Sequence, residues 1–264
     1  MIIRVLTENS TLSPSWTAEH GLSLYIETGD RRILFDAGQS DAFAENALKM
    51  GVDLTKVDFA VLSHGHYDHS GGLMRFLEIN DHAPVYVSCH AFGAHYHGEE
   101  RYIGVDPALS QSGRIVPVKG VTELGAGIAL HSCEGMPMPV PLDSAGLTRC
   151  EGGQFCPDDF RHEQYLSICE DEKRVLISGC SHRGILNIAG WFQPDVLVGG
   201  FHFMKLDPAQ SADRERLEKA AQALLAYPTQ YYSGHCTGEA PYAFLKERMG
   251  ERLMPLCTGQ EITL

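Results

Sequence analysis

The sequence predicts an α/β fold (α+β) in which two β-sheets pack together and helices cover their outer faces. Strand-like segments occur in both halves of the chain with helical segments between them, which fits two packed sheets better than one parallel sheet. The 264 residues are 44% hydrophobic and 21% charged, a balance typical of a globular chain long enough to bury a full core. Neither a repeat nor a linker interrupts residues 1–264, so we expect a single domain.

The first third of the chain is predicted to contain short strands and strand–helix units. Short β-rich segments separated by polar or glycine-containing turns indicate strands, and apolar residues at helical spacing before Gly51 indicate a helix. In chain order we expect strands at 2–6, 22–27 and 32–36, a helix at 41–50, a strand at 59–63, a helix at 71–79 and a strand at 84–88.

The middle of the chain is less regular. It contains a histidine-rich piece, short strands at 114–118 and 128–132, and a proline- and glycine-rich tract from 135 to 159. A long irregular segment is more often functional than idle, so we predict a substrate-binding or lid insertion around residues 91–160. Beyond it we expect strands at 164–169 and 175–178, a helix at 184–191, a strand at 196–198, a helix at 209–226, a strand ending at 233, a helix at 240–249 and a terminal strand.

Composition narrows the class of partner. The formal net charge of −13 argues against nucleic acid or an anionic membrane surface as the main partner and leaves a small-molecule substrate. The sequence begins with strand-like residues and has no apolar stretch long enough for a bilayer, so we expect a cytoplasmic protein with mostly free thiols. The 13 histidines and 8 cysteines indicate metal chemistry, although no C-x-x-C pair supports a zinc knuckle.

The segment SHGHYDHSGG at residues 63–72 carries the chemistry. His64 and His66 are two residues apart after an apolar strand, so in extended backbone their rings point the same way. Asp68 and His69 follow where the chain turns, so their side chains can face a second metal position. A solvated histidine-rich loop is the alternative, but four ligand-type side chains within six residues favour a one- or two-metal site.

This H-x-H-x-D-H run after a strand resembles the signature of the metallo-β-lactamase superfamily. The segment ILFDAG at 33–38 is similar to the superfamily's early aspartate-containing strand end, which implies that Asp36 orients a ligand histidine. The chain further resembles the dihydropterin-ribofuranosyl-aminobenzene-phosphate synthase-like subfamily in the segments EHGLS (19–23), GCSHRG (179–184), GGFH (199–202) and GHCTG (234–238). The resemblance implies a four-layer αββα sandwich, with the metals at one edge between the sheets.

The chain departs from the superfamily pattern at two ligand positions. Cys180 stands where the resemblance predicts an aspartate that bridges both metals, and no histidine occupies the usual upstream position, although His162 and Glu163 are near it. We expect a bridging Cys180 thiolate, which favours zinc, and manganese or iron as the other candidate metals. A buried Cys180 that only packs, and a one-metal site, are the alternatives. The ligand sets that we expect are His64, His66 and His182 for one metal, and Asp68, His69 and His235 for the other.

Other residues are weaker candidates. His202 follows an apolar strand and is expected either to act in the cleft as a proton donor or substrate contact, or to cap the next helix; His20 is similarly ambiguous. The segment HYHGEE contains a potential second metal cluster, but we favour a solvated helix or loop for it; its residues are His95, Tyr96, His97, Glu99 and Glu100. Candidate anion contacts, each more simply a surface charge, are Arg101, Arg149, Arg161, Arg183 and Lys205.

We therefore expect a metal-dependent hydrolase that uses a metal-activated water on a small-molecule ester. A phosphoester or phosphorylated metabolite is the preferred substrate, and lactones and thioesters are alternatives. In this hypothesis Asp68 binds metal and accepts the proton of the water, while His202 assists the leaving group. Two other functions stay open: an iron-dependent redox or oxygen-reacting protein, and a non-catalytic sensor that binds a small ligand through its metal.

Overall fold

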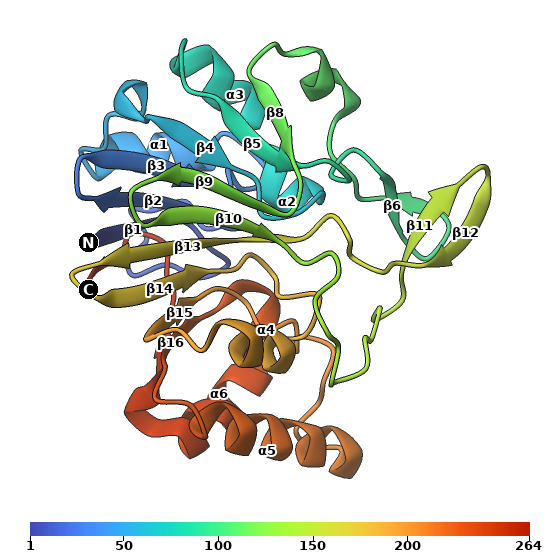
Figure 1. Cartoon of the computed structure of the whole chain (residues 1–264). Coiled ribbons are helices and arrows are strands. Elements are labelled where there is room, and N and C mark those ends of the chain that lie inside the picture. The colour runs from blue at the N-terminus through green and yellow to red at the C-terminus, as the bar shows by residue number, and fades with distance from the viewer.

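Two seven-stranded sheets lie face to face in the computed structural model, which describes residues 1–264 (Figure 1). The core between them contains 19 buried apolar residues. Side chains alternate along each strand, so Leu24 and Ile26 of one strand face the opposite sheet while Tyr25 between them faces the helices. Both faces of each sheet are therefore apolar, as a layer between two other layers requires.

The first sheet combines antiparallel and parallel pairing. Its strands from the amino-terminal part pair antiparallel, and the pairs β3–β4, β4–β5 and β5–β8 are parallel. In spatial order the strands are β18 (Glu261–Thr263), β1 (Ile2–Thr7), β2 (Ser23–Thr28), β3 (Arg31–Phe35), β4 (Phe59–Val61), β5 (Val85–Ser88) and β8 (Ile115–Val118).

The second sheet repeats this arrangement with the other half of the chain. The pairs β14–β15, β15–β16 and β16–β17 are parallel, and the remaining pairs are antiparallel. In spatial order the strands are β17 (Leu253–Pro255), β16 (Gln230–Ser233), β15 (Val196–Val198), β14 (Lys173–Ile177), β13 (Gln164–Glu170), β10 (Ile128–Ser132) and β9 (Val121–Gly125).

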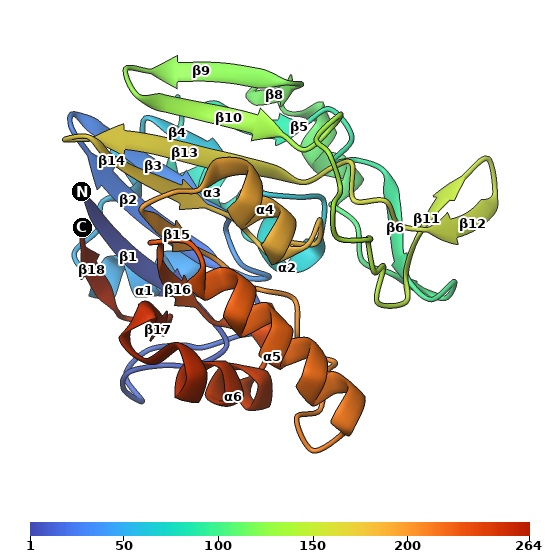
Figure 2. The same ribbon diagram turned by 60° about the horizontal axis from the view of Figure 1, so that its bottom comes forward.

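Helices cover the outer face of each sheet (Figures 1 and 2). The first sheet packs against α1 (Ala42–Lys49) and α3 (Leu73–Ile79), and the second against α4 (Ile185–Phe192), α5 (Ser211–Leu225) and α6 (Glu239–Met249). The αββα order confirms the predicted fold class. The remaining helical turns are α2 (Tyr67–Ser70) and 3-10 turns at Leu54–Lys56, Pro107–Gln111, His235–Thr237 and Gly250–Arg252.

A third, four-stranded sheet projects from one end of the sandwich (Figures 1 and 2). Two predictions for this region were wrong: the tract 135–159 contains a hairpin, and residues 94–97 form a strand instead of a helix or loop. The segment 91–160 is divided, because it also supplies β8, β9 and β10 to the large sheets. The strands of the small sheet are β12 (Gln154–Pro157), β11 (Leu147–Glu151), β6 (Ala94–His97) and β7 (Arg101–Tyr102).

The elements predicted from the sequence are present in the large sheets and their helices, with ends that differ by a few residues. The expected terminal strand is two strands, β17 and β18, which belong to different sheets. None of the helices combines the length and apolar character that a bilayer span requires.

Candidate metal centre

The predicted ligands lie in turns that follow parallel strands of both sheets. His64 to His69 follow β4, Cys180 and His182 follow β14, and His235 follows β16. In open α/β sheets ligands bind outside the carboxyl ends of the strands. Here the two packed sheets present those ends at a common edge, which brings together side chains up to 166 residues apart in the sequence (His69 and His235).

The backbone of the histidine-rich turn explains its spacing. His66 is extended (φ −113°, ψ 150°) and directly precedes the single helical turn α2, so Asp68 and His69 project from a different direction. Gly65 packs against a neighbouring loop, where a Cβ atom would lie 2.2 Å from the carbonyl oxygen of Ala91. Only glycine fits at that position, so the turn and the loop fix each other.

The first predicted ligand group is assembled. The ligand atoms of His64, His66 and His182 lie within 4.8 Å of one another, and the Nε2 atoms of His64 and His182 are 3.3 Å apart. All three side chains are buried, and burial lowers the pKa of each well below its usual value. The rings are therefore neutral at physiological pH, which is the form that binds metal.

The second predicted group is assembled beside the first. His69 Nε2 lies 3.2 Å from His235 Nε2, and Asp68 Oδ2 lies 3.4 Å from His235 Nε2 and 3.8 Å from His69 Nε2. Burial by itself would raise the pKa of Asp68, but His69, His20 and His235 hold it well below its usual range. Asp68 is therefore an anion, as a metal-binding carboxylate must be.

Hydrogen bonds fix which ring nitrogen faces the centre. Ser63 Oγ donates to Asp36 (2.7 Å) and therefore accepts from His64 Nδ1 (2.8 Å), which leaves a lone pair on His64 Nε2. His69 Nδ1 donates to Asp36 (2.6 Å) and His235 Nδ1 to Asn9 Oδ1 (2.8 Å). The Nε2 atoms of His69 and His235 thus face each other, and that of His64 faces His182 Nε2, an arrangement that cations between the facing nitrogens would stabilise.

Cys180 lies between the two groups. Its Sγ is 3.2 Å from His69 Nε2. The sulfur lies within 4.8 Å of ligand atoms of His64 and His69, and also within 4.8 Å of those of His235 and Cys236. The sulfur thus lies close to ligand atoms of both groups. Burial raises the pKa of the Cys180 thiol well above its usual value in the metal-free protein. Cys236, whose thiol donates to the Cys180 carbonyl (3.4 Å), was not among the predicted ligands.

The donor set fits divalent metal ions. The first group supplies three imidazoles, the second supplies two imidazoles and the Asp68 carboxylate, and the Cys180 sulfur lies beside both. Nitrogen, oxygen and sulfur donors of this kind are the ligand chemistry of zinc and related transition metals. In addition, His66 Nε2 and His182 Nδ1 are buried without a hydrogen-bond partner. Orphaned polar atoms of this kind are costly unless an ion or water satisfies them.

A cavity of about 220 Å³ opens over the centre. Asp68, Cys180 and His182 line this cavity together with His20 and His202. His20 Nε2 lies 3.3 Å from Asp68 Oδ2, so this residue belongs to the site although the sequence pattern made it only a weak candidate.

His202 faces the same cavity, with its ring centroid 4.2 Å from that of His182. The alternative in which it caps the next helix was wrong, because α5 begins at Ser211 with Gln210 as its N-cap. Burial, followed by the nearby His235 and Lys205, lowers the pKa of His202 to about 4. The ring is therefore neutral at physiological pH, with one nitrogen that donates a hydrogen bond and one that accepts.

The five candidate anion contacts divide into two kinds. Arg101 and Lys205 line the cavity, and Arg101 Nη2 also donates to Tyr67 OH (2.9 Å). The others are engaged away from it: Arg149 and Arg161 pair with Glu151 and Asp159, and Arg183 donates to the carbonyl of Asp159 (2.7 Å).

The two residues near the missing upstream ligand have structural partners. Glu163 accepts hydrogen bonds from the backbone N atoms of His182 (2.7 Å) and Arg183 (2.9 Å) and from Tyr165 OH (2.7 Å). The carboxylate thereby fixes the turn that carries His182. Burial raises the pKa of Glu163 above its usual value.

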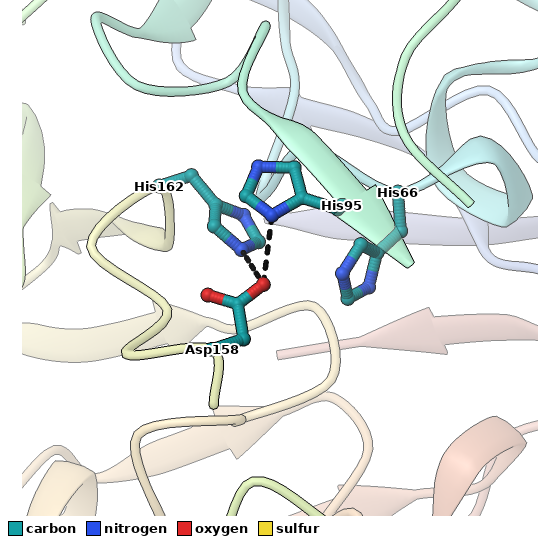
Figure 3. A group of neighbouring side chains, drawn as sticks. All are labelled: His66, His95, Asp158 and His162. Carbon is teal, nitrogen blue, oxygen red and sulfur yellow. Dashed lines mark hydrogen bonds and ion pairs between the residues drawn. The ribbon is translucent and has the colours of Figure 1, made fainter. Parts of the chain in front are cut away.

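His162 belongs to a buried cluster with His66, His95 and Asp158 (Figure 3). The backbone N of Gly65 donates to His162 Nδ1 (2.9 Å), so the ring proton is on Nε2, which faces Asp158 Oδ2 at 3.5 Å. His95 Nδ1 donates to the same oxygen at 2.7 Å. These directions make Asp158 a hydrogen-bonded anchor for the histidine-rich turn.

The same cluster corrects the prediction of a solvated HYHGEE segment. His95 is buried on β6, with 3% of its surface exposed. Its neighbours Tyr96, His97, Glu99 and Glu100 do not join a metal-type group. The composition of the segment suggested a second cluster. The partners of His95, however, are Asp158 and His162, which lie more than sixty residues away in the sequence (63 for Asp158).

The fold and the buried histidine centre define a metal-dependent hydrolase of the αββα type. A family model described as the metallo-beta-lactamase superfamily matches residues 16–228, and the chain belongs to this superfamily. A solved structure described as a metal-dependent hydrolase of the beta-lactamase superfamily superposes with a TM-score of 0.83 and 30% identity, covering 100% of this chain and 99% of that one.

Two curated relatives come from Methanocaldococcus jannaschii. A 7,8-dihydropterin-6-methyl-4-(beta-D-ribofuranosyl)-aminobenzene-5'-phosphate synthase is 29% identical over 261 residues, which cover 89% of this chain and 86% of that protein. An uncharacterised protein is 30% identical over 213 residues, which cover 77% of this chain and 80% of its own length. The predicted superfamily and subfamily resemblance are thereby confirmed.

Proposed function

We propose that the chain is a binuclear metal hydrolase of small phosphoesters or phosphorylated metabolites. The observation that carries the proposal is the pair of adjacent ligand groups, with the Nε2 atoms of His64 and His182 3.3 Å apart in one and those of His69 and His235 3.2 Å apart in the other. We assign His64, His66 and His182 to the first metal, Asp68, His69 and His235 to the second, and Cys180 as the bridge.

Zinc is the preferred metal because a thiolate and several imidazoles are softer donors than carboxylates. When bound, such ions act as Lewis acids and lower the pKa of coordinated water. Around them, Asp68 is placed to hold a water molecule and to accept its proton, since its carboxylate faces the cavity. His202 supplies a neutral N–H donor to the leaving-group oxygen.

The choice of a phosphoester is supported by the cavity rim and by one relative's name. Arg101 and Lys205 both line the cavity, and they place two positive charges near an incoming anion although the chain as a whole is acidic. The synthase relative is named for a product that carries a 5'-phosphate. The dimensions of the cavity, about 220 Å³, favour a small molecule over a polymer.

Metal analysis of the purified protein combined with assays on p-nitrophenyl phosphoesters and on lactones tests the proposal. We expect two equivalents of zinc or manganese per chain and turnover of a phosphoester that is abolished in Asp68→Ala. The matched control is Asp58→Ala, which removes a half-buried carboxylate at the start of β4, the end of this strand opposite the histidine-rich turn. Stoichiometric iron with oxygen consumption would overturn the proposal in favour of redox chemistry, and full metal occupancy without turnover of any ester would favour a sensor.

A further inference from the structure

A second cavity adjoins the one over the metal centre. It has a volume of about 270 Å³ and shares Ala145, His182, His202 and Lys205 with the first. Its other walls include the half-buried apolar side chains of Leu142, Leu186, Phe203 and Leu206 and the charged side chains of Asp143, Arg216 and Lys219. Buried Ile185 and Phe201 also line it.

One wall of this cavity is the chain segment 137–145, which we call the strap. It belongs to the connection between β10 and β11, which passes α4 in Figure 1. The strap has no helix or strand of its own, so its position depends on its contacts with the rest of the protein.

Four side chains fasten the strap along its length. Trp191 Nε1 donates to the Pro137 carbonyl (2.7 Å), and the Asn187 side chain makes two hydrogen bonds with the Val140 backbone (2.9 Å each). Arg216 Nη2 pairs with Asp143 at 3.0 Å, and Lys205 Nζ donates to the Ala145 carbonyl. Their partners lie on α4, on α5 and in the turn after β15, so the strap is a fixed wall.

The contents of such a space follow from its chemistry. Binding of a ligand that covers the apolar part of these walls is favoured by about 25 cal/mol of free energy for each Å² of apolar surface removed from water. A cavity of roughly 150 Å³ with apolar walls accommodates a benzene ring, so about 270 Å³ accommodates a ring-sized group. The shared edge with His202 is also where the proposed function places the leaving group.

We infer that the space beneath the strap is a leaving-group subsite, and that the substrate is an anionic ester whose leaving group is apolar and ring-sized. The inference rests on the proposed function for the position of the reacting bond. The anionic group occupies the metal-centre cavity near Lys205 and Arg101, and the ring packs against Leu142 and Phe203.

Equilibrium binding of two non-hydrolysable probes tests the subsite without requiring turnover. We expect the holoprotein to bind 1-naphthylphosphonate at least roughly tenfold more tightly than methylphosphonate, because the ring buries additional apolar surface. In Leu142→Ser this preference falls about tenfold while the affinity for methylphosphonate is unchanged. Phe203→Ala provides a second variant, and Val121→Ser, which changes an exposed side chain of β9 (65% exposed), is the control.

Equal affinity of the wild-type protein for both phosphonates would overturn the inference, as would a loss of affinity for both probes in Leu142→Ser. The outcome is separable from that of the proposed function. Selective binding of the naphthyl probe without hydrolysis of any naphthyl or methyl phosphoester supports the subsite and contradicts the hydrolase proposal. Hydrolysis of both esters with equal KM values supports the hydrolase and contradicts the subsite.

Discussion

The Asp36 carboxylate lies 2.6 Å from His69 Nδ1 and accepts two further hydrogen bonds of 2.7 Å from the backbone N and Oγ of Ser63. Asp36 itself is fully buried in a left-handed conformation (φ 58°). A single carboxylate therefore orients His69 directly and His64 through the Ser63 hydroxyl. The two ligand groups share this one anchor.

Replacing Asp36 with asparagine should weaken metal binding without unfolding the protein. Asparagine fits the left-handed conformation, but its amide N–H₂ must face one of three donors. Loss of such an orienting partner typically costs about 10- to 100-fold in metal affinity, and we expect a drop of that size. Competition with a chromogenic zinc chelator measures it, with Asp58→Asn as the control; unchanged zinc affinity in Asp36→Asn would contradict the role assigned to the carboxylate.

Asp158 performs a related task for the histidine-rich turn. Its carboxylate accepts from His95 and faces His162, whose other nitrogen accepts from the backbone of Gly65. Asp158→Asn should destabilise the protein by about 1–3 kcal/mol, because a buried donor loses its partner. It should also lower zinc affinity through the displaced turn.

Urea unfolding with and without a chelator, together with zinc titration, separates these two effects. The matched control is Asp159→Asn, the same chemical change one residue away at a half-buried site paired with Arg161 (2.9 Å). If Asp158→Asn lost stability but bound zinc as tightly as the wild type, Asp158 would be a packing residue without influence on the centre.

Most residues of the candidate metal centre could be predicted from the sequence because they are concentrated in short segments at strand ends. Four ligand-type residues occur at 64–69, and Cys180 and His182 lie in a similar strand-end turn. His20, His95 and Cys236 were missed or given low weight, since each meets its partner across at least 48 residues (His20 and Asp68), where no local pattern exists. The hairpin β11–β12 was not predicted for a related reason. Glycines 152 and 153 form its turn within a tract whose composition is typical of an irregular loop.

Near-ultraviolet absorption of the cobalt-substituted protein should show that Cys180 binds metal. Cobalt(II) bound to a thiolate gives a near-ultraviolet charge-transfer band, and metal coordination deprotonates a thiol even where burial raises its pKa. We expect the band in cobalt-substituted wild-type protein and its loss in Cys180→Ala. Cys236→Ala is the control, because that thiol is directed at the Cys180 carbonyl. A band that disappeared only in Cys236→Ala would assign the sulfur ligand to the neighbouring residue.

The free energy of unfolding should decline in alkali, and the buried Cys133 thiol is one of the groups responsible. Burial raises the pKa of the Cys133 thiol from 9.0 to about 12 and those of Tyr25 and Tyr231 from 10.0 to about 12. The unfolded chain therefore loses these protons first. Above pH 9 it binds fewer protons than the folded protein, so the free energy of unfolding falls as pH rises.

Between pH 9 and 10 the decline belongs mainly to the buried thiols Cys133 and Cys180, and Cys133 contributes a limiting slope of about 1.4 kcal/mol per pH unit. Cys133→Ser keeps a hydroxyl able to donate to the Phe160 carbonyl, as the thiol does at 3.4 Å, but does not ionise in this range. We expect a shallower decline of the urea midpoint in Cys133→Ser, whatever its stability at pH 7. The exposed Cys169→Ser should follow the wild-type curve; an identical slope in all three proteins would mean that the Cys133 thiol ionises as readily in the folded state as in the unfolded one.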